Sequence, residues 1–328
     1  MLRADAGARG ASELWIKNDG LTHPRYGGNK LRKLEHVLPE AKRRGARRIV
    51  TLGAAGSHHV LATTLFAKEH GLRVAAVLFP QPHSAHAELT LSVALAHGLQ
   101  AEPAPSLAGA IAAAARLLQR GDFLLPAGGS NVTGTLGYLD AAVELAGQIR
   151  AGELPLPDAV MVALGSGGTA GGLLAGFALA GIATRVVAVS VLPSFVVGKA
   201  LVVSLAAAAL RRTGSGERRS LPALGRALAV DTAWLGRGYG FATPEGDHAT
   251  AVAAGLGIEL DPTYTAKTFA AALARTGAGP TAAARRPSEP QRILYWHTLS
   301  SAPLEPLLTE AQRGVALPPE LSRLLVRR

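Results

Sequence analysis

The stretch "DAVMVALGSGGTAGGLLAGFALAG" (residues 158–181) joins a short apolar run, a glycine-rich turn and an alanine-rich helical segment. The same order recurs along the chain: "RRIVTLGAAG" leads into "SHHVLATTLFAKEHG", and "LRVAAVLFP" leads into "SAHAELTLSVALAHG". Buried strands that alternate with helices are typical of parallel sheets with helices on both faces. The pattern therefore predicts an α/β fold, in which ligands bind at the turns that follow the carboxyl ends of the strands.

The first strand of the quoted stretch ends in five small residues, which are Gly165, Ser166, Gly167, Gly168 and Thr169. Glycine amides can point inward as an anion-binding nest, and the helix N-terminus that follows adds partial positive charge. The turn lacks the lysine of a P-loop and the glycine spacing of a dinucleotide-binding fingerprint. We interpret it as a phosphate site; the alternative is a tight turn whose glycines serve packing.

The composition restricts the function classes. The chain has 328 residues, which suffice for one large or two medium domains, and it has no cysteine, which excludes disulfides, thiolate metal sites and cysteine nucleophiles. The net charge of +11 is spread along the chain, and the densest basic cluster, "AKRRGARR" (41–48), has no aromatic neighbours for nucleic acid to stack on. The most apolar stretch is interrupted by Pro193 and Lys199, which makes it a poor membrane span. We expect a soluble, cytoplasmic protein that binds neither nucleic acid nor membrane.

The segment "HPRYGGNKLRKLE" (23–35) contains two of only seven lysines. A phosphate cradle without a metal signature, the absence of thiols and a lysine beside "GGN" together indicate pyridoxal phosphate, which needs an amine for a Schiff base. The other five lysines fall within strands or helices. Lys30 directly follows the glycine turn, where a ligand can approach closely, so it is the candidate amine, and Lys33 is predicted to be a surface residue.

Six segments, in order, resemble the D-cysteine desulfhydrase and 1-aminocyclopropane-1-carboxylate deaminase family, whose members are pyridoxal-phosphate enzymes with the tryptophan-synthase β-subunit fold. They are "LWIKNDGLTHPRYGGNKLRKLEHVL", "TLGAAGSHHVLATTLFAKEHGL", "LGSGGTAGGLLAG", "GRGYGFATPEG", "LDPTYTAKTFAAL" and "ILYWHT". The resemblance implies a small domain (36–148) inserted into a large cofactor-binding domain (1–35 plus 149–328). We also expect a homodimer.

The resemblance implies a role for each matching residue. Lys30 would hold the cofactor and act as the base at the substrate α-carbon, Ser57 would lie near the substrate carboxylate, and Tyr239 and Tyr264 would flank the cofactor ring. The residues implied to contact the cofactor are Asn29, Lys30, His58, Gly165, Ser166, Gly167, Gly168, Thr169, Thr265 and Thr298. His58 stands where the family has an asparagine near the phenolic oxygen of the cofactor.

Two positions bear on the reaction. Thr265 and Thr298 stand where the deaminase branch has glutamate and leucine, and a threonine offers the ring nitrogen only a neutral hydrogen bond. This favours α,β-elimination from a small amino acid, which gives an α-keto acid and ammonia. The changes at His58 and at residues 299–301 keep two alternatives open: a biosynthetic or racemising enzyme, and a cofactor-binding pseudoenzyme.

The histidines of "SHH" and "HSAH", which are His58, His59, His83 and His86, are candidates for a metal site. These pairs lie on different elements and have no carboxylate partner at ligand spacing, so no metal is expected. A serine hydrolase based on Ser57 and His59 lacks the glycine pattern of a nucleophile elbow.

Overall fold

Residues 158–181 form strand β8 (Ala159–Leu164), which leads through the glycine turn into helix α6 (Gly168–Ala180). The computed structural model describes residues 2–4, 12–215, 220–277 and 291–326. The chain divides into two compact units. We call Met1–Asn29 with Thr135–Ser301 unit 1, and Lys30–Gly134 with Ala302–Arg328 unit 2.

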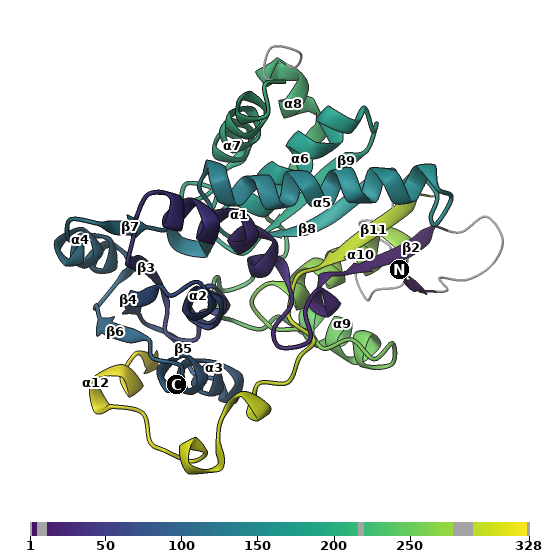
Figure 1. The fold of residues 1–328 in the computed structure, drawn as a ribbon. Helices are drawn as coiled ribbons and strands as arrows, with labels where there is room; N and C mark the ends of the chain where they lie inside the picture. Colours follow the sequence, from purple (N-terminus) through teal and green to yellow (C-terminus); the bar gives the residue numbers. More distant parts are fainter. Residues whose placement is uncertain (1, 5–11, 216–219, 278–290, 327–328) are drawn as a thin grey trace. The chain divides into compact units, whose positions relative to one another are not determined.

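Unit 1 is built on a six-stranded sheet with the order β1-β2-β11-β8-β9-β10 (Figure 1). Neighbouring strands are parallel, except that β1 runs antiparallel to β2. The remaining strands of this sheet are β1 (Leu2–Ala4), β2 (Glu13–Asn18), β9 (Arg185–Ser190), β10 (Leu228–Asp231) and β11 (Arg292–His297).

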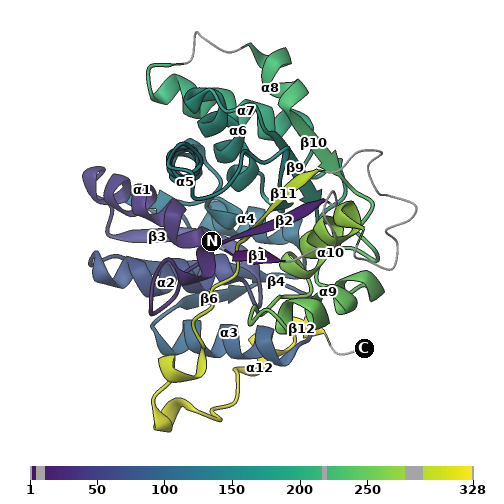
Figure 2. The same cartoon turned by 90° about the vertical axis from the view of Figure 1, so that its right-hand side faces the viewer.

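Helices cover both faces of this sheet, because successive residues of a strand point to opposite sides. Val160 and Val162 of β8 pack into a core with residues of α5 to α8, whereas Ala159 and Met161 pack into a second core with residues of α9 and α10. Figure 2 shows the two groups of helices on opposite sides of the strands. Besides α6, the helices are α5 (Val132–Arg150), α7 (Lys199–Arg212), α8 (Leu221–Ala227), α9 (Pro244–Ala254) and α10 (Thr265–Thr276), with a 3-10 turn η1 (Asp19–Leu21).

Unit 2 contains a four-stranded parallel sheet with the order β6-β4-β3-β7. Val50 and Leu52 of β3 pack with α4 on one face, and Thr51 between them bonds to His59 of α2 on the other. The strands are β3 (Arg48–Ala54), β4 (Arg73–Phe79), β6 (Gln100–Pro103) and β7 (Asp122–Leu124). The helices are α1 (Asn29–Arg43), α2 (His58–Glu69), α3 (Ala85–Ala96), α4 (Leu107–Leu117) and the 3-10 turn η2 (Ala127–Gly129).

The last segment of the chain belongs to unit 2, whereas the sequence-based boundaries placed it in the large domain. Strand β12 (Leu325–Val326) pairs with β5 (Gln81–Pro82), and His97 Nε2 bonds to the carbonyl of Leu307 at 2.9 Å. Between these contacts lie the 3-10 turns η4 (Glu305–Leu307) and η5 (Glu310–Gln312) and the short helix α12 (Pro319–Ser322). A two-residue strand leaves too weak a hydrophobic pattern for its partner to be read from sequence.

The sequence-based boundaries ended the small domain at residue 148. The structure ends this part of unit 2 within α5, between Gly134 and Thr135. From Thr135 onward this helix lies directly against α6. A Cβ on Gly172 would meet the carbonyl oxygen of Thr135 at 2.5 Å, and one on Gly176 would meet the carbonyl oxygen of Leu139 at 2.4 Å. The glycines of α6 therefore let two helix backbones approach closely.

The predicted α/β class, with parallel sheets and helices on both faces, is confirmed. In the part of the chain that the structure describes, we find no helix with the length and apolar character needed to cross a membrane.

Candidate functional site

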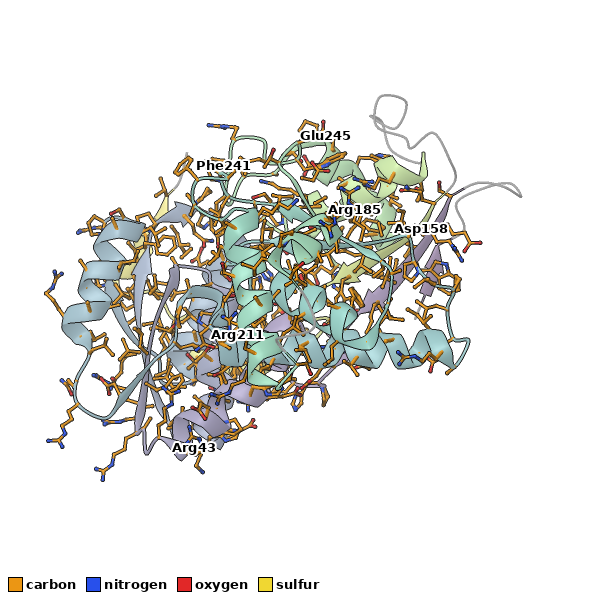
Figure 3. The ribbon with its side chains drawn as sticks, turned by 90° about the horizontal axis from the view of Figure 1, so that it is seen from above. Arg43, Asp158, Arg185, Arg211, Phe241 and Glu245 are labelled. Atoms are coloured by element: carbon orange, nitrogen blue, oxygen red, sulfur yellow. The ribbon has the colours of Figure 1, made fainter. Side chains whose placement is uncertain are left out.

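The glycine turn lies at the carboxyl end of β8. Asp158 and Arg185, whose backbones are joined by a 3.1 Å hydrogen bond, mark the opposite, amino ends of β8 and β9 (Figure 3). Gly167 caps α6 with a φ of 89°, a left-handed conformation that favours glycine. A Cβ on Gly165 would meet Cε1 of Tyr264 at 2.9 Å. The turn thus presents bare backbone at a helix N-terminus, which fits a bound phosphate.

Asn29 ties this turn to the end of β11. Its Nδ2 donates to Thr169 Oγ1 at 3.2 Å, and its backbone N–H donates to the carbonyl of Thr298 at 3.1 Å. Three residues that the sequence predicted for the site therefore meet within unit 1. Lys30, the candidate amine, is the next residue of the chain and the first of unit 2.

The two predicted tyrosines also meet. Tyr264 Oη donates to Tyr239 Oη at 3.1 Å, and the rings cross edge to face at 84°. Loss of hydration raises the pKa of both hydroxyls, and the charge of Asp261 acts in the same direction. Both tyrosines are therefore neutral at physiological pH, and Tyr239, which accepts this hydrogen bond, keeps its own proton to donate.

Asp261 is a site residue that the sequence analysis missed. Its Oδ1 accepts from the backbone N–H groups of Thr263 and Tyr264 at 2.9 and 2.7 Å. Its Oδ2 accepts from the backbone N–H of Thr265 at 3.1 Å and from the Thr265 hydroxyl at 2.7 Å. The carboxylate thereby caps the first turn of α10 and fixes the backbone that carries Tyr264. The sequence signal is an aspartate and proline just before a helix.

The cap also defines what Thr265 can do. Its hydroxyl donates its single proton to Asp261 and accepts a hydrogen bond from the Asp261 backbone N–H at 2.7 Å. Toward a third group this hydroxyl can act only as an acceptor. The resemblance implied a hydrogen bond from position 265 to the cofactor ring nitrogen, and in this arrangement Thr265 has no proton left to give.

His297 lies beside this cap at the end of β11. It is 1% exposed, and its Nδ1 lies 3.1 Å from Tyr295 Oη. Burial lowers the pKa of His297 to about 4, although the charges of Asp261 and Asp19 oppose the shift. The imidazole is therefore neutral at physiological pH.

In unit 2, Ser57 lies at the start of α2. It is the N-cap, and its Oγ accepts from the backbone N–H of Val60 at 3.4 Å. His58, the first residue of the helix, is half-buried and its Nε2 lies 3.2 Å from Nε2 of His86 on α3. The contact of His58 with the cofactor stays a prediction.

The four histidines considered for a metal do not form one cluster. His59 is buried and its Nε2 lies 2.8 Å from Thr51 Oγ1, whereas His83 pairs with Glu88 at 2.9 Å. Among the described residues no group of three or more histidines or carboxylates is placed to hold a metal ion.

Lys33 contradicts the surface position predicted for it. It is 2% exposed, and its Nζ donates to the carbonyl of Gly128 at 2.9 Å and to Ser130 Oγ at 3.1 Å. Burial holds the pKa of Lys33 well below its ordinary value, and the charge of Lys30 lowers it further. The pKa of His59 is lowered by burial and then by both lysines. The surface prediction was wrong because the acceptors of this amine come from nearly one hundred residues away.

A family model described as pyridoxal-phosphate dependent enzyme matches residues 1–289. A solved structure described as an ACC deaminase homologue is 28% identical, with a TM-score of 0.70 over 90% of this chain and 89% of that chain. A fungal L-serine ammonia-lyase from Rhizomucor miehei is 16% identical, with a TM-score of 0.59 over 94% of each chain. A hydrogen sulfide-producing enzyme from Fusobacterium nucleatum is 15% identical, with a TM-score of 0.60 over 91% of this chain and 94% of that chain. At such identities the last two share the fold.

Proposed function

The chain belongs to the pyridoxal-phosphate-dependent enzymes, and from this membership we propose that it is a lyase that eliminates a β-substituent from a small amino acid. The α-carbon loses its proton, the β-carbon loses its substituent with the bonding electrons, and hydrolysis gives an α-keto acid and ammonia. Thiolate or chloride leaving groups fit this reaction, as in D-cysteine or a β-chloro amino acid.

One observation carries the proposal. The bare glycine turn contacts the ring of Tyr264, and Asn29, which directly precedes Lys30 in the sequence, bonds to Thr169 in the first turn of α6. Pyridoxal phosphate, when bound, supplies an electron sink for negative charge at the substrate α-carbon. The chain's own groups would do the rest: the backbone from Gly165 to Thr169 would bind the phosphate, and the Lys30 amine would hold the cofactor and take the α-proton.

The tyrosines and Ser57 would act on the substrate. Tyr239 has a proton to donate, and Tyr264 orients that hydroxyl through their hydrogen bond. Ser57 stands at a helix N-terminus, where a substrate carboxylate is favoured by the helix dipole.

The state of Thr265 supports elimination over ring opening. Its only hydroxyl proton is bound to Asp261, and the four donors on Asp261 hold that carboxylate in the helix cap. No charged partner for the cofactor ring nitrogen is thus offered from position 265, which suits a reaction with a good leaving group. Two fold relatives carry descriptions in keeping with this class, as an ammonia-lyase and as a hydrogen sulfide-producing enzyme.

The test begins with the cofactor. Protein loaded with pyridoxal phosphate is expected to absorb in the visible range; Lys30→Ala should lose this band, and Lys68→Ala, at an exposed position of α2, should keep it. A wild-type protein that stays colourless with added cofactor would overturn the proposal.

The reaction is then read with the two enantiomers of cysteine, serine and β-chloroalanine. We expect at least one of these amino acids to give a keto acid. The keto acid is measured by reducing it in a coupled assay. In deuterated water, exchange at the α-carbon without keto acid would replace elimination by a racemising activity, and a band that no amino acid perturbs would indicate a pseudoenzyme. We further propose a homodimer, to be checked by light scattering of the loaded protein.

A further inference from the structure

Tyr239 sits in a segment without regular secondary structure, the loop of residues 232–243 between β10 and α9. Figure 3 labels Phe241 in this loop and Glu245 in the first turn of α9. Gly236, Gly238 and Gly240 all adopt positive φ, at 57°, 114° and 80°. Glycines of this kind permit many backbone conformations, so the position of Tyr239 depends on the groups that hold the loop.

The ends of the loop are held locally. Asp231 accepts from the indole N–H of Trp234 at 3.1 Å, and Thr243 caps α9 by accepting from the backbone N–H of Gly246 at 3.1 Å. Neither contact reaches the residues on either side of Tyr239.

In the centre of the loop, the backbone N–H of Gly238 donates to the carbonyl of Leu235 at 3.1 Å and that of Phe241 to the carbonyl of Gly238 at 3.4 Å, and Lys267 links these two carbonyls to α10. This lysine of α10 is fully buried, and its Nζ donates to the carbonyl of Leu235 at 2.9 Å and to that of Gly238 at 2.8 Å. Gly238 immediately precedes Tyr239. Burying an amine among neutral acceptors costs free energy, and burial lowers the pKa of Lys267 to about 8 although the charge of Asp261 opposes the shift. Packing alone does not explain why a side chain with this free-energy cost of burial occupies the position.

Helix α10 carries two residues that determine the tyrosine pair: Tyr264 itself and Lys267, which binds the loop of Tyr239. Tyr264 is its N-cap residue, and Lys267 follows three residues later. We propose that Lys267 is a positioning residue for the reaction: its amine holds the loop so that the hydroxyl of Tyr239 meets that of Tyr264. The inference rests on the proposed function, because that function gives Tyr239 a role in the reaction. The two hydrogen bonds from Lys267 to the loop, which we call the clamp, lie entirely within unit 1.

The test compares Lys267→Met, which keeps the length of the side chain without its donors, with Lys68→Met as the control. Arg237 is exposed in the middle of the loop, so trypsin reports its opening at the bond between Arg237 and Gly238. Mass spectrometry of the cofactor-loaded protein without amino acid would follow this cleavage relative to cleavage after Arg120, an exposed turn residue. We expect Lys267→Met to raise the relative rate at least tenfold and to lower kcat by a similar factor, with a smaller change in KM.

Thermal unfolding would show whether the variant is folded. If Lys267→Met does not fold, Lys267→Gln carries the test, since its amide retains two donors one bond short of the acceptors and should give intermediate values. A folded variant whose cleavage at Arg237, or whose kcat, equals that of the wild type overturns the inference. Wild-type protein that turns over no amino acid would overturn the lyase proposal, whereas the cleavage assay needs no substrate and would still report the clamp.

Discussion

Replacing His297 should change how the stability of unit 1 depends on pH. This histidine is 1% exposed, and burial lowers its pKa from 6.5 to about 4 in the folded protein. An unfolded chain returns the imidazole to water, where it takes up a proton near pH 6.5. Folded and unfolded states therefore bind different numbers of protons between these two values.

The sign and size follow from this difference. Between pH 6.5 and 4 the unfolded state binds more protons, so the free energy of unfolding falls as the pH falls through that window. The shift from 6.5 to about 4 corresponds to about 3 kcal/mol at full protonation of the unfolded chain. At pH 5 the unfolded chain is largely protonated and the folded one is not, and the loss relative to pH 7.5 is about 2 kcal/mol.

Urea unfolding followed by tryptophan fluorescence is the assay. Trp15, Trp234 and Trp296 are the three tryptophans of the chain and all lie in unit 1. Any contribution of the buried His59 of unit 2 is the same in wild type and variant and cancels in their difference. Between pH 7.5 and 5 the wild type should lose about 2 kcal/mol more than His297→Gln. The control is His248→Gln, at an exposed position of α9, which should follow the wild type. Equal losses in the wild type and His297→Gln would refute the reasoning.

Three further substitutions test a helix contact, a helix cap and an ion pair of the two units. Gly172→Ala places a Cβ 2.4 Å from a side-chain atom of α5 and should lower the free energy of unfolding by about 1–3 kcal/mol. Gly147→Ala, which has open space around it, should not lower the free energy of unfolding. Urea unfolding of both variants measures the difference. Asp261→Ala removes the acceptor of three backbone amides and should weaken cofactor binding as well as stability, measured by titration of the visible band. Arg48→Met leaves the half-buried Asp122 carboxylate without its two-pronged guanidinium partner and should cost unit 2 about 1–3 kcal/mol, measured by thermal unfolding followed by circular dichroism; a melting temperature equal to that of the wild type would contradict it.

The strand and helix pattern could be read from sequence because it is local. The buried strands are short apolar runs, and the turn from Gly165 to Thr169 is visible as small residues in a row. The meeting of Tyr239 with Tyr264 followed from a resemblance and not from periodicity, since nothing local links residues 25 positions apart.

The missed features share a physical cause. A lysine amine can be buried only where backbone carbonyls or hydroxyls converge on it, and those of Lys33 and Lys267 come from distant segments. Both lysines lie in helices, where a charged side chain is ordinarily expected to face solvent. Asp261 carried a readable signal, since an aspartate just before a helix predicts a cap, but its influence on the surrounding tyrosines depends on the fold.

The strand pairings set the order in which this chain can be completed on the ribosome. β2 pairs along its whole length with β11, from Glu13 opposite Arg292 to Asn18 opposite His297, and β5 waits for β12 at Leu325. At roughly 5–20 residues per second, synthesis reaches these partners roughly 15–60 s after β2 emerges. During that interval the apolar side chains of β2, Leu14 and Ile16, which end almost fully buried, have no finished sheet to join. The sheet of unit 1 cannot be completed before β11 is made, and β5 of unit 2 cannot pair before β12 is made. Leu14 and Ile16 therefore stay exposed for most of the time that synthesis of the chain takes.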